Sequence, residues 1–187
     1  GDTMRIAAIS ASQRKNMNSE NILNYTAEQL EQGGHQVEKV CLSQTQVSGC
    51  IACGGCANQE RCVNDEKANQ INKVLKEADV ILAVTPVYFG SMTSQLKALF
   101  DKTLPLRRNG FLLKNKYGAA ISVGKSRNGG QELALKDIHS WMFIHGMRVI
   151  GDNGHFGGTV VADFENDETG RQTVDGVINA IKSLSRQ

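Results

Sequence analysis

The sequence is short of proline, of net charge and of long apolar runs. Its two prolines and nineteen glycines suit an α/β protein with many tight turns between strands and helices. A formal net charge of +2, with no basic run longer than Arg107-Arg108, argues against nucleic acid as a partner. No apolar stretch reaches the ~18 residues of a membrane span, and no signal peptide opens the sequence. We therefore expect no membrane partner and a location in the reducing cytoplasm.

Several catalytic and cofactor motifs are also missing. There is no nucleophile elbow, no Ser–His–Asp arrangement and no G-x-G-x-x-G dinucleotide fingerprint. The segment 118–126 departs from the nucleotide P-loop because five residues, instead of four, separate its two glycines. The histidines form no i, i+4 pair, so we expect surface or core roles for them. No side chain is assigned to acid–base or nucleophilic catalysis.

Apolar runs alternate with amphipathic segments along the whole chain. Strands are expected at 4–9, 35–42, 80–84, 117–123 and 147–150, and helices near 18–33, 66–78, 93–103, 131–145 and 173–184. Asn18 or Ser19 is the expected N-cap of the first helix, and the stretch 152–170 has no clear pattern. This alternation predicts one domain, residues 1–187, with a parallel sheet covered on both faces. The expected architecture is a flavodoxin-like three-layer sandwich with a five-stranded sheet of order 2-1-3-4-5.

In such a fold, the loops after strands one, three and four meet beyond the C-terminal edge of the sheet. The loop 10–19 offers hydroxyls, amides, two cations and a helix N-terminus, which suit a phosphate, although a plain capped loop is the alternative. The loop 86–90 is apolar and aromatic, so it could hold a planar ring, unless Tyr88 and Phe89 are core or interface residues. The loop 124–130 is rich in glycine and could close over the ring or be a solvent turn.

Four of the five cysteines lie within thirteen residues, in the long connection 43–64 after the second strand. Two, two and five residues separate them, and Gly54-Gly55 allows the tight turn that would bring the thiols together. Tetrahedral sulfur sites suit zinc or iron–sulfur clusters, and this compact run is more typical of a four-iron cluster. A cluster, a zinc ion and free or oxidised thiols all stay open, with the cluster favoured. The candidate ligands are Cys50, Cys53, Cys56 and Cys62, whereas Cys41 is interpreted as a small buried hydrophobe.

Together these segments resemble the NADPH-dependent FMN reductase family. The resemblance rests on 12–14 with Asn18-Ser19, on 85–93 with Lys97 and Asp101, and on 126–132. With the four cysteines added, the chain resembles one branch of that family, the iron–sulfur flavoproteins of anaerobic microbes. The resemblance implies bound FMN, a [4Fe-4S] cluster held by the four cysteines, and dimers or tetramers that place the cluster near a neighbouring subunit's flavin.

The resemblance also assigns residues to FMN. Those implied for the phosphate are Ser10, Ser12, Arg14, Asn18 and Ser19. Those implied for the ring are Pro86, Val87, Tyr88, Phe89 and Gly90, flanked by Ser126, Arg127, Gly129 and Gly130.

We therefore predict a flavin-dependent oxidoreductase that passes electrons between a [4Fe-4S] cluster, FMN and a protein or small-molecule partner. NAD(P)H is a candidate electron donor, and the expected assembly is a homodimer or homotetramer. Two alternatives remain: an NAD(P)H-dependent FMN or quinone reductase without a cluster, and a zinc-stabilised binding module without catalysis.

Overall fold

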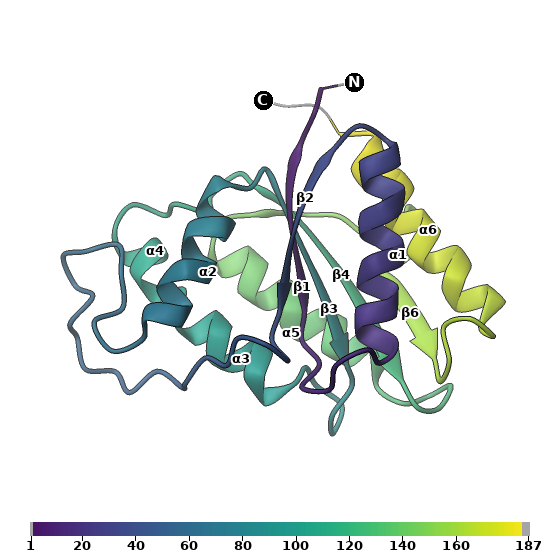
Figure 1. Cartoon of the computed structure of the whole chain (residues 1–187), viewed down its shortest axis with the longest axis horizontal. Helices are drawn as coiled ribbons and strands as arrows, with labels where there is room; N and C mark the ends of the chain where they lie inside the picture. Colours follow the sequence, from purple (N-terminus) through teal and green to yellow (C-terminus); the bar gives the residue numbers. More distant parts are fainter. Residues whose placement is uncertain (1, 185–187) are drawn as a thin grey trace.

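A parallel sheet forms the middle layer of the protein, and all but one of its strands end at one common edge, at the bottom of Figure 1. The computed structural model describes residues 2–184. The strands are β1 (Arg5–Ser10), β2 (Gln36–Cys41), β3 (Val80–Pro86), β4 (Tyr117–Gly124), β5 (Arg148–Val149) and β6 (Gly158–Val161). Their order is β2-β1-β3-β4-β5, with β6 also pairing with β4, so the predicted flavodoxin-like order is confirmed.

Helices cover both faces of this sheet (Figure 1). On one face lie α1 (Asn18–Gln32) and α6 (Glu168–Lys182). On the other lie α2 (Glu66–Glu77), α3 (Ser94–Asp101), α4 (Leu104–Arg108) and α5 (Gln131–Ile144). The central strands β1 and β3 read as nearly continuous apolar runs because both of their faces are buried. In the part of the chain that is described, no helix combines the length and the apolar character needed to cross a membrane.

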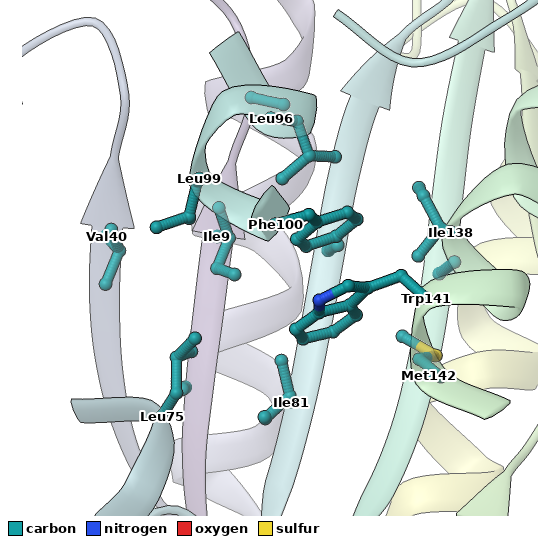
Figure 2. Close-up of a cluster of buried hydrophobic side chains, with 14 of the residues drawn as sticks. Ile9, Val40, Leu75, Ile81, Leu96, Leu99, Phe100, Ile138, Trp141 and Met142 are labelled. Carbon is teal, nitrogen blue, oxygen red and sulfur yellow. The ribbon is translucent and has the colours of Figure 1, made fainter. Parts of the chain in front are cut away.

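An aromatic pair fixes α3 against α5 (Figure 2). The rings of Phe100 and Trp141 stack with their centroids 3.9 Å apart and their planes 3° from parallel. Trp141 is almost fully buried and its Nε1 donates a hydrogen bond of 3.0 Å to Thr103 Oγ1. Because its flat face is buried and its indole N–H has a partner, Trp141 is a packing residue.

The sequence prediction missed two short elements. Strand β6 was hidden in the stretch without pattern, because a four-residue strand beginning at a glycine carries little periodic signal. Strands β5 and β6 both pair with β4 and together form the edge of the sheet. Arg148 of β5 pairs with the first residue of β4, and Val161 of β6 pairs with the last residue of β4. Helix α4 is a five-residue turn with a proline in its first turn, and it lies just beyond the helix predicted at 93–103, in a stretch to which the sequence assigned no element.

Two predicted helix boundaries were also wrong. The last helix starts at Glu168 rather than near 173, because the Asp167 side chain accepts a hydrogen bond from Gly170 N and caps it. The N-cap of α1 is Met17, not Asn18 or Ser19, and within the described chain no side chain caps this helix.

Candidate functional site

The loops that follow β1, β3, β4 and β6 are joined to one another at the C-terminal edge of the sheet. Thr93, the N-cap of α3, donates from its hydroxyl to Ala11 O at 2.9 Å and so ties the β3 loop to the β1 loop. The β3 and β4 loops meet at two glycines: a Cβ on Gly130 would lie only 2.9 Å from the Cα of Gly90. The three loops that the sequence assigned to one site therefore do come together.

Asn18 connects a fourth loop to this site. Its Oδ1 accepts a hydrogen bond of 3.0 Å from Phe164 N, and its Nδ2 donates to Ala162 O. Ala162 N in turn donates to Gly124 O at 2.7 Å, which links the β6 loop back to the β4 loop. The family resemblance assigns Asn18 to the FMN phosphate, and in this structure its amide holds the loop after β6.

The β1 loop has the features of an anion site. The first N–H groups of α1 meet no side-chain cap within residues 2–184, and such groups favour an anion through their dipoles. Arg14 is exposed, and its backbone N–H bonds to the hydroxyl of the buried Ser12 at 3.1 Å. Ser19 is also buried, and the buried hydroxyl of Ser10 has no hydrogen-bond partner among the described residues. The donors and the orphaned hydroxyl fit a phosphate.

The β3 loop ends in a tight hairpin turn. Tyr88 N donates to Ser91 O at 2.9 Å, and Ser91 N donates to Tyr88 O at 3.1 Å. Between them, Phe89 and Gly90 have φ angles of 49° and 74°, so both lie in the left-handed region. Phenylalanine is strained there, and its ring is fully exposed at the tip of the turn. An exposed, strained aromatic beside a ligand loop is suited to contact a ligand or a second chain.

Gln131, which the sequence analysis did not single out, fixes the backbone of the β4 loop through two hydrogen bonds. This buried side chain accepts a hydrogen bond from Gly129 N at 3.0 Å and donates one to Ser126 O at 2.8 Å. Gly130 has a φ of 90°, so the loop turns sharply before α5 begins. The exposed residues Ser126 and Arg127 are thus presented on a fixed backbone.

The four clustered cysteines line a separate cavity of about 200 Å³. The C-terminal end of α3 and the start of α4 form its other wall, including Lys102, Pro105 and Arg108. Among residues 2–184, none from the loops 10–19, 86–90 or 124–130 lines this cavity. Because α3 runs from the β3 loop to Lys102, its length, about 12 Å for eight residues, separates the two sites. The cysteine loop leaves the sheet at the shared edge, where β2 ends beside β1, and continues to this separate cavity.

Each of the four sulfurs has an N–H donor nearby. The donors come from a backbone amide, an asparagine and two cations. The pairs are Ala52 N to Cys50 at 3.5 Å, Asn64 Nδ2 to Cys53 at 3.2 Å, Arg108 Nη1 to Cys56 at 3.7 Å, and Lys102 Nζ to Cys62 at 3.6 Å. Donors and cations of this kind stabilise negatively charged sulfur, which is the form that binds metal.

The thiols can be compared with the ligand sets that zinc and an iron–sulfur cluster require. All five cysteines are free thiols, and in the described part of the chain no three metal-binding side chains converge on a single point. A tetrahedral zinc ion needs its sulfurs at about 2.3 Å, so the four would have to lie close together. A four-iron cluster spreads its ligand sulfurs over the corners of a larger tetrahedron. The common cavity, four thiols and four donors therefore fit a cluster.

The fifth cysteine is not part of this site. Cys41 is half-buried at the end of β2, and burial together with the nearby Glu20 carboxylate raises the pKa of its thiol. It stays protonated and packs against the apolar cluster between the sheet and α1, close to what the sequence predicted.

A parallel sheet of this order, with an anion loop and a ring loop at its C-terminal edge, defines a flavodoxin-like, flavin-dependent oxidoreductase. The family model described as NADPH-dependent FMN reductase matches residues 4–159. The chain is 48% identical over 171 residues to an iron–sulfur flavoprotein of Methanosarcina thermophila, covering 91% of this chain and 90% of that protein. It is 39% identical over 177 residues to an iron–sulfur flavoprotein of Methanocaldococcus jannaschii, covering 91% of each. The chain belongs to the NADPH-dependent FMN reductase family, in its iron–sulfur flavoprotein branch.

Solved structures agree on the fold. The apo form of the NADH:FMN oxidoreductase EmoB superimposes with a TM-score of 0.73 at 22% identity, covering 99% of this chain and 92% of that one. The NAD(P)H:acceptor oxidoreductase FerB from Paracoccus denitrificans gives a TM-score of 0.71 at 18% identity, with 96% of each chain covered.

Several residues around both sites escaped the sequence prediction. Lys102 and Arg108 lie far along the chain from the cysteines they contact, so no local spacing marks them. Gln131 contacts its own loop, two and five residues away, but a glutamine at the start of a helix carries no distinctive signal. The one available signal was a charged residue at the end of an apolar helix, which is usually a solvated position.

Proposed function

We propose that this single-domain protein transfers electrons by means of two cofactors, FMN in the loops at the sheet edge and a [4Fe-4S] cluster at Cys50, Cys53, Cys56 and Cys62. The observation that carries the proposal is the pairing of an uncapped helix N-terminus with a separate cavity into which four free thiols face. The membership of the family supports the flavin, and the donors around the sulfurs support the cluster.

In the proposed flavin site, the FMN phosphate lies at the N-terminus of α1. The exposed Arg14 supplies positive charge, and the first-turn amides and the hydroxyls of Ser12 and Ser19 supply donors. Ser10 forms the floor of this pocket. Asn18 acts indirectly by holding the β6 loop in place.

The ring of FMN lies between the second and third loops. Residues 86–90 offer backbone amides and the half-exposed Tyr88, and the loop 126–130 flanks the ring from the other side. Gly130 is needed for their close approach, since a Cβ at this position would lie 2.9 Å from the Cα of Gly90.

When bound, FMN takes up two electrons and releases them one at a time, while a cluster carries one. The chain's own residues position the two groups and tune them; no side chain is proposed as an acid or base. Because the length of α3 lies between the two sites of one chain, transfer between cofactors is best served by a neighbouring subunit.

We further propose a homodimer or homotetramer, with NAD(P)H or a redox protein as the electron donor and a small molecule or protein as the acceptor. The names of EmoB and FerB give nicotinamide nucleotides as substrates of those proteins, which supports but does not fix this choice. Five free thiols suit a reducing cytoplasm.

Cofactor analysis of protein purified without oxygen tests the proposal. We expect one FMN, four irons and four sulfides per chain. The Cys53→Ala variant should lose the cluster and keep FMN, whereas the control Cys41→Ala should keep both. Protein that takes up no flavin after reconstitution would overturn the flavin claim, and Cys53→Ala with full iron content would overturn the cluster.

The same samples separate the alternatives. An FMN or quinone reductase without a cluster would oxidise NAD(P)H at an unchanged rate after each cysteine is replaced. A zinc-stabilised binding module would be colourless and would contain one zinc per chain.

A further inference from the structure

We infer that Lys102 sets the reduction potential of the cluster by holding a fixed positive charge against the sulfur of Cys62. The inference rests on the proposed function, in which Cys62 is a cluster ligand. Lys102 is a positioning and tuning residue here, since it touches the ligand and not the reacting partner.

Lys102 is buried to an extent that is unusual for lysine. Its side chain is only 3% exposed, although it carries a charge. The Nζ atom lies 3.6 Å from Cys62 Sγ, 3.4 Å from Ser48 Oγ and 3.6 Å from Asp65 Oδ2. The ammonium thus lies between these three partners at the wall of the cysteine cavity, and its low exposure limits the screening of its charge by water.

The chain fixes both members of the contact. Asn69 on α2 clasps the backbone of Cys62: Cys62 N donates to its Oδ1 at 2.7 Å, and its Nδ2 donates to Cys62 O at 2.8 Å. Asn72, one turn further along α2, donates to Lys102 O at 2.9 Å. One face of α2 thus sets the distance between the cation and the sulfur.

Asp65 neutralises the lysine only in part. Its Oδ1 accepts from Ala68 N at 3.0 Å as the N-cap of α2. Its Oδ2 accepts from Ser48 N at 3.0 Å and Ser48 Oγ at 2.9 Å, and the ammonium lies beyond hydrogen-bond distance. A carboxylate shared among so many donors leaves a net positive field at Cys62.

A gain in folding stability does not explain why the charged side chain of Lys102 is buried here. A buried ion pair is often no more stable than an apolar replacement, so the fold gains little from placing a lysine here. Arg108 differs: it approaches Cys56 at 3.7 Å through an exposed contact, where water and salt screen its charge. Of the two cations, Lys102 therefore has the larger effect on the cluster.

The direction of the effect follows from charge. One-electron reduction adds a negative charge to the cluster, and a nearby cation stabilises the reduced form more than the oxidised form. Removal of the Lys102 charge should therefore lower the reduction potential, and a substitution that keeps the charge should preserve it.

A redox titration with dithionite at one fixed pH, followed by the cluster's visible and paramagnetic signals, tests the inference. For Lys102→Met and Lys102→Gln we expect the reduced cluster to become at least tenfold less favoured, which is about 59 mV for a one-electron couple. Lys102→Arg should stay near the wild-type potential. Lys73→Met, which removes an exposed cation from the neighbouring helix α2 outside the cysteine cavity, is the control and should leave the potential unchanged.

The outcomes are separable. Cluster potentials equal to wild type in both neutral variants would overturn the inference and leave the proposed function standing. Loss of iron from both, with iron retained in Lys102→Arg, would also overturn it, because Lys102 would then serve assembly of the site. Equal shifts of the cluster and flavin couples would point to a general disturbance and would likewise overturn it. Wild-type protein that binds FMN but no iron contradicts the proposed function itself, before any variant is made.

Discussion

A single residue, Gly130, decides how close two cofactor loops lie. Its φ of 90° favours glycine, and any Cβ there would press on the backbone of Gly90. Phe89 lies at the same edge and also has a left-handed φ, of 49°, although it is not a glycine. Its ring is fully exposed. Backbone strain of this kind clusters at residues that contact a ligand or take part in function.

His145 is a buried residue whose protonation the fold opposes. The Thr103 hydroxyl donates to Phe100 O at 2.6 Å, so it accepts from both Trp141 Nε1 and the Nε2–H of His145, which lies 2.8 Å away. The other ring nitrogen, Nδ1, is buried and has no partner among the described residues. Burial, and secondarily the charge of Arg107, lower the pKa of His145 to about 4.

This pKa predicts acid destabilisation. The unfolded chain takes up the proton near pH 6.5 and the folded chain only near pH 4, so stability is complete above pH 6.5 and falls as the pH drops towards 4. The full loss is about 3 kcal/mol for this 2% exposed residue. His145→Gln, which keeps a donor to Thr103, should flatten the pH dependence of urea unfolding between pH 7 and pH 4.5. If the slope of stability against pH is the same in this variant as in wild type, His145 is not the group responsible. The variant still contains the buried His139, whose lowered pKa contributes in the same direction, so some pH dependence should remain.

At the scale of elements, the cysteine loop is held by the helices beside it. Asn109, the C-cap of α4, donates from its side chain to Cys56 O at 3.1 Å and to Gln59 O at 2.7 Å. Asn69 on α2 holds the other end of the loop at Cys62. Exposed ion pairs such as Arg61–Glu66 add little by comparison. Two asparagine clasps therefore keep a long connection in one conformation.

We predict that Asn69→Ala loosens this loop. Two backbone groups of Cys62 lose their partners, at a cost of about 1–3 kcal/mol. Iron should then leave to a chelator at least tenfold faster, while FMN content stays the same. Iron release followed by absorbance measures the effect, with the exposed neighbour Gln70→Ala as control. Equal rates for Asn69→Ala and wild type would show that the clasp does not hold the site.

Two short strands, β5 and β6, share the edge of the sheet beside β4, and this arrangement affects the candidate flavin site. Because β5 pairs only with the start of β4 and β6 only with its end, the chain between them is free to loop out. The β6 loop then reaches the flavin edge, where Asn18 holds it. A continuous fifth strand would place the same residues differently.

At the scale of the whole molecule, the outer face of α5 carries three large apolar side chains among polar ones. Leu133, Phe143 and Ile144 are all more than half exposed, and Phe156 stands beside them around one cavity with Leu133 and Phe143. Contiguous exposed apolar side chains mark interaction surfaces. With the two cofactor sites apart in one chain, a second copy on this face is the occupant that fits the proposed electron transfer.

We predict that Phe143→Ser weakens self-association at least tenfold, because buried aromatic residues carry much of the energy of an interface. Sedimentation at several protein concentrations measures it. Glu28→Ser on the exposed side of α1 is the control and should not change the assembly. Wild-type protein that stays monomeric at high micromolar concentration would contradict the prediction.

The sequence alone determined the order of the five strands it predicted, the five longer helices that cover them, and the segments that carry the candidate cofactor residues. Burial on both faces leaves β1 and β3 as apolar runs, and the cysteine spacing is a local property of thirteen residues. Such features are readable because they depend on neighbours along the chain.

Only the tertiary structure decided where the cysteines lie and what surrounds them. Lys102 meets Cys62 across 40 positions of sequence, and Arg108 meets Cys56 across 52. The end of α3 has to be packed against α2 before either contact exists, and local pattern does not encode that packing. The same reason hid β6 and α4: elements of four and five residues are stabilised by the partners they pack on, not by their own periodicity.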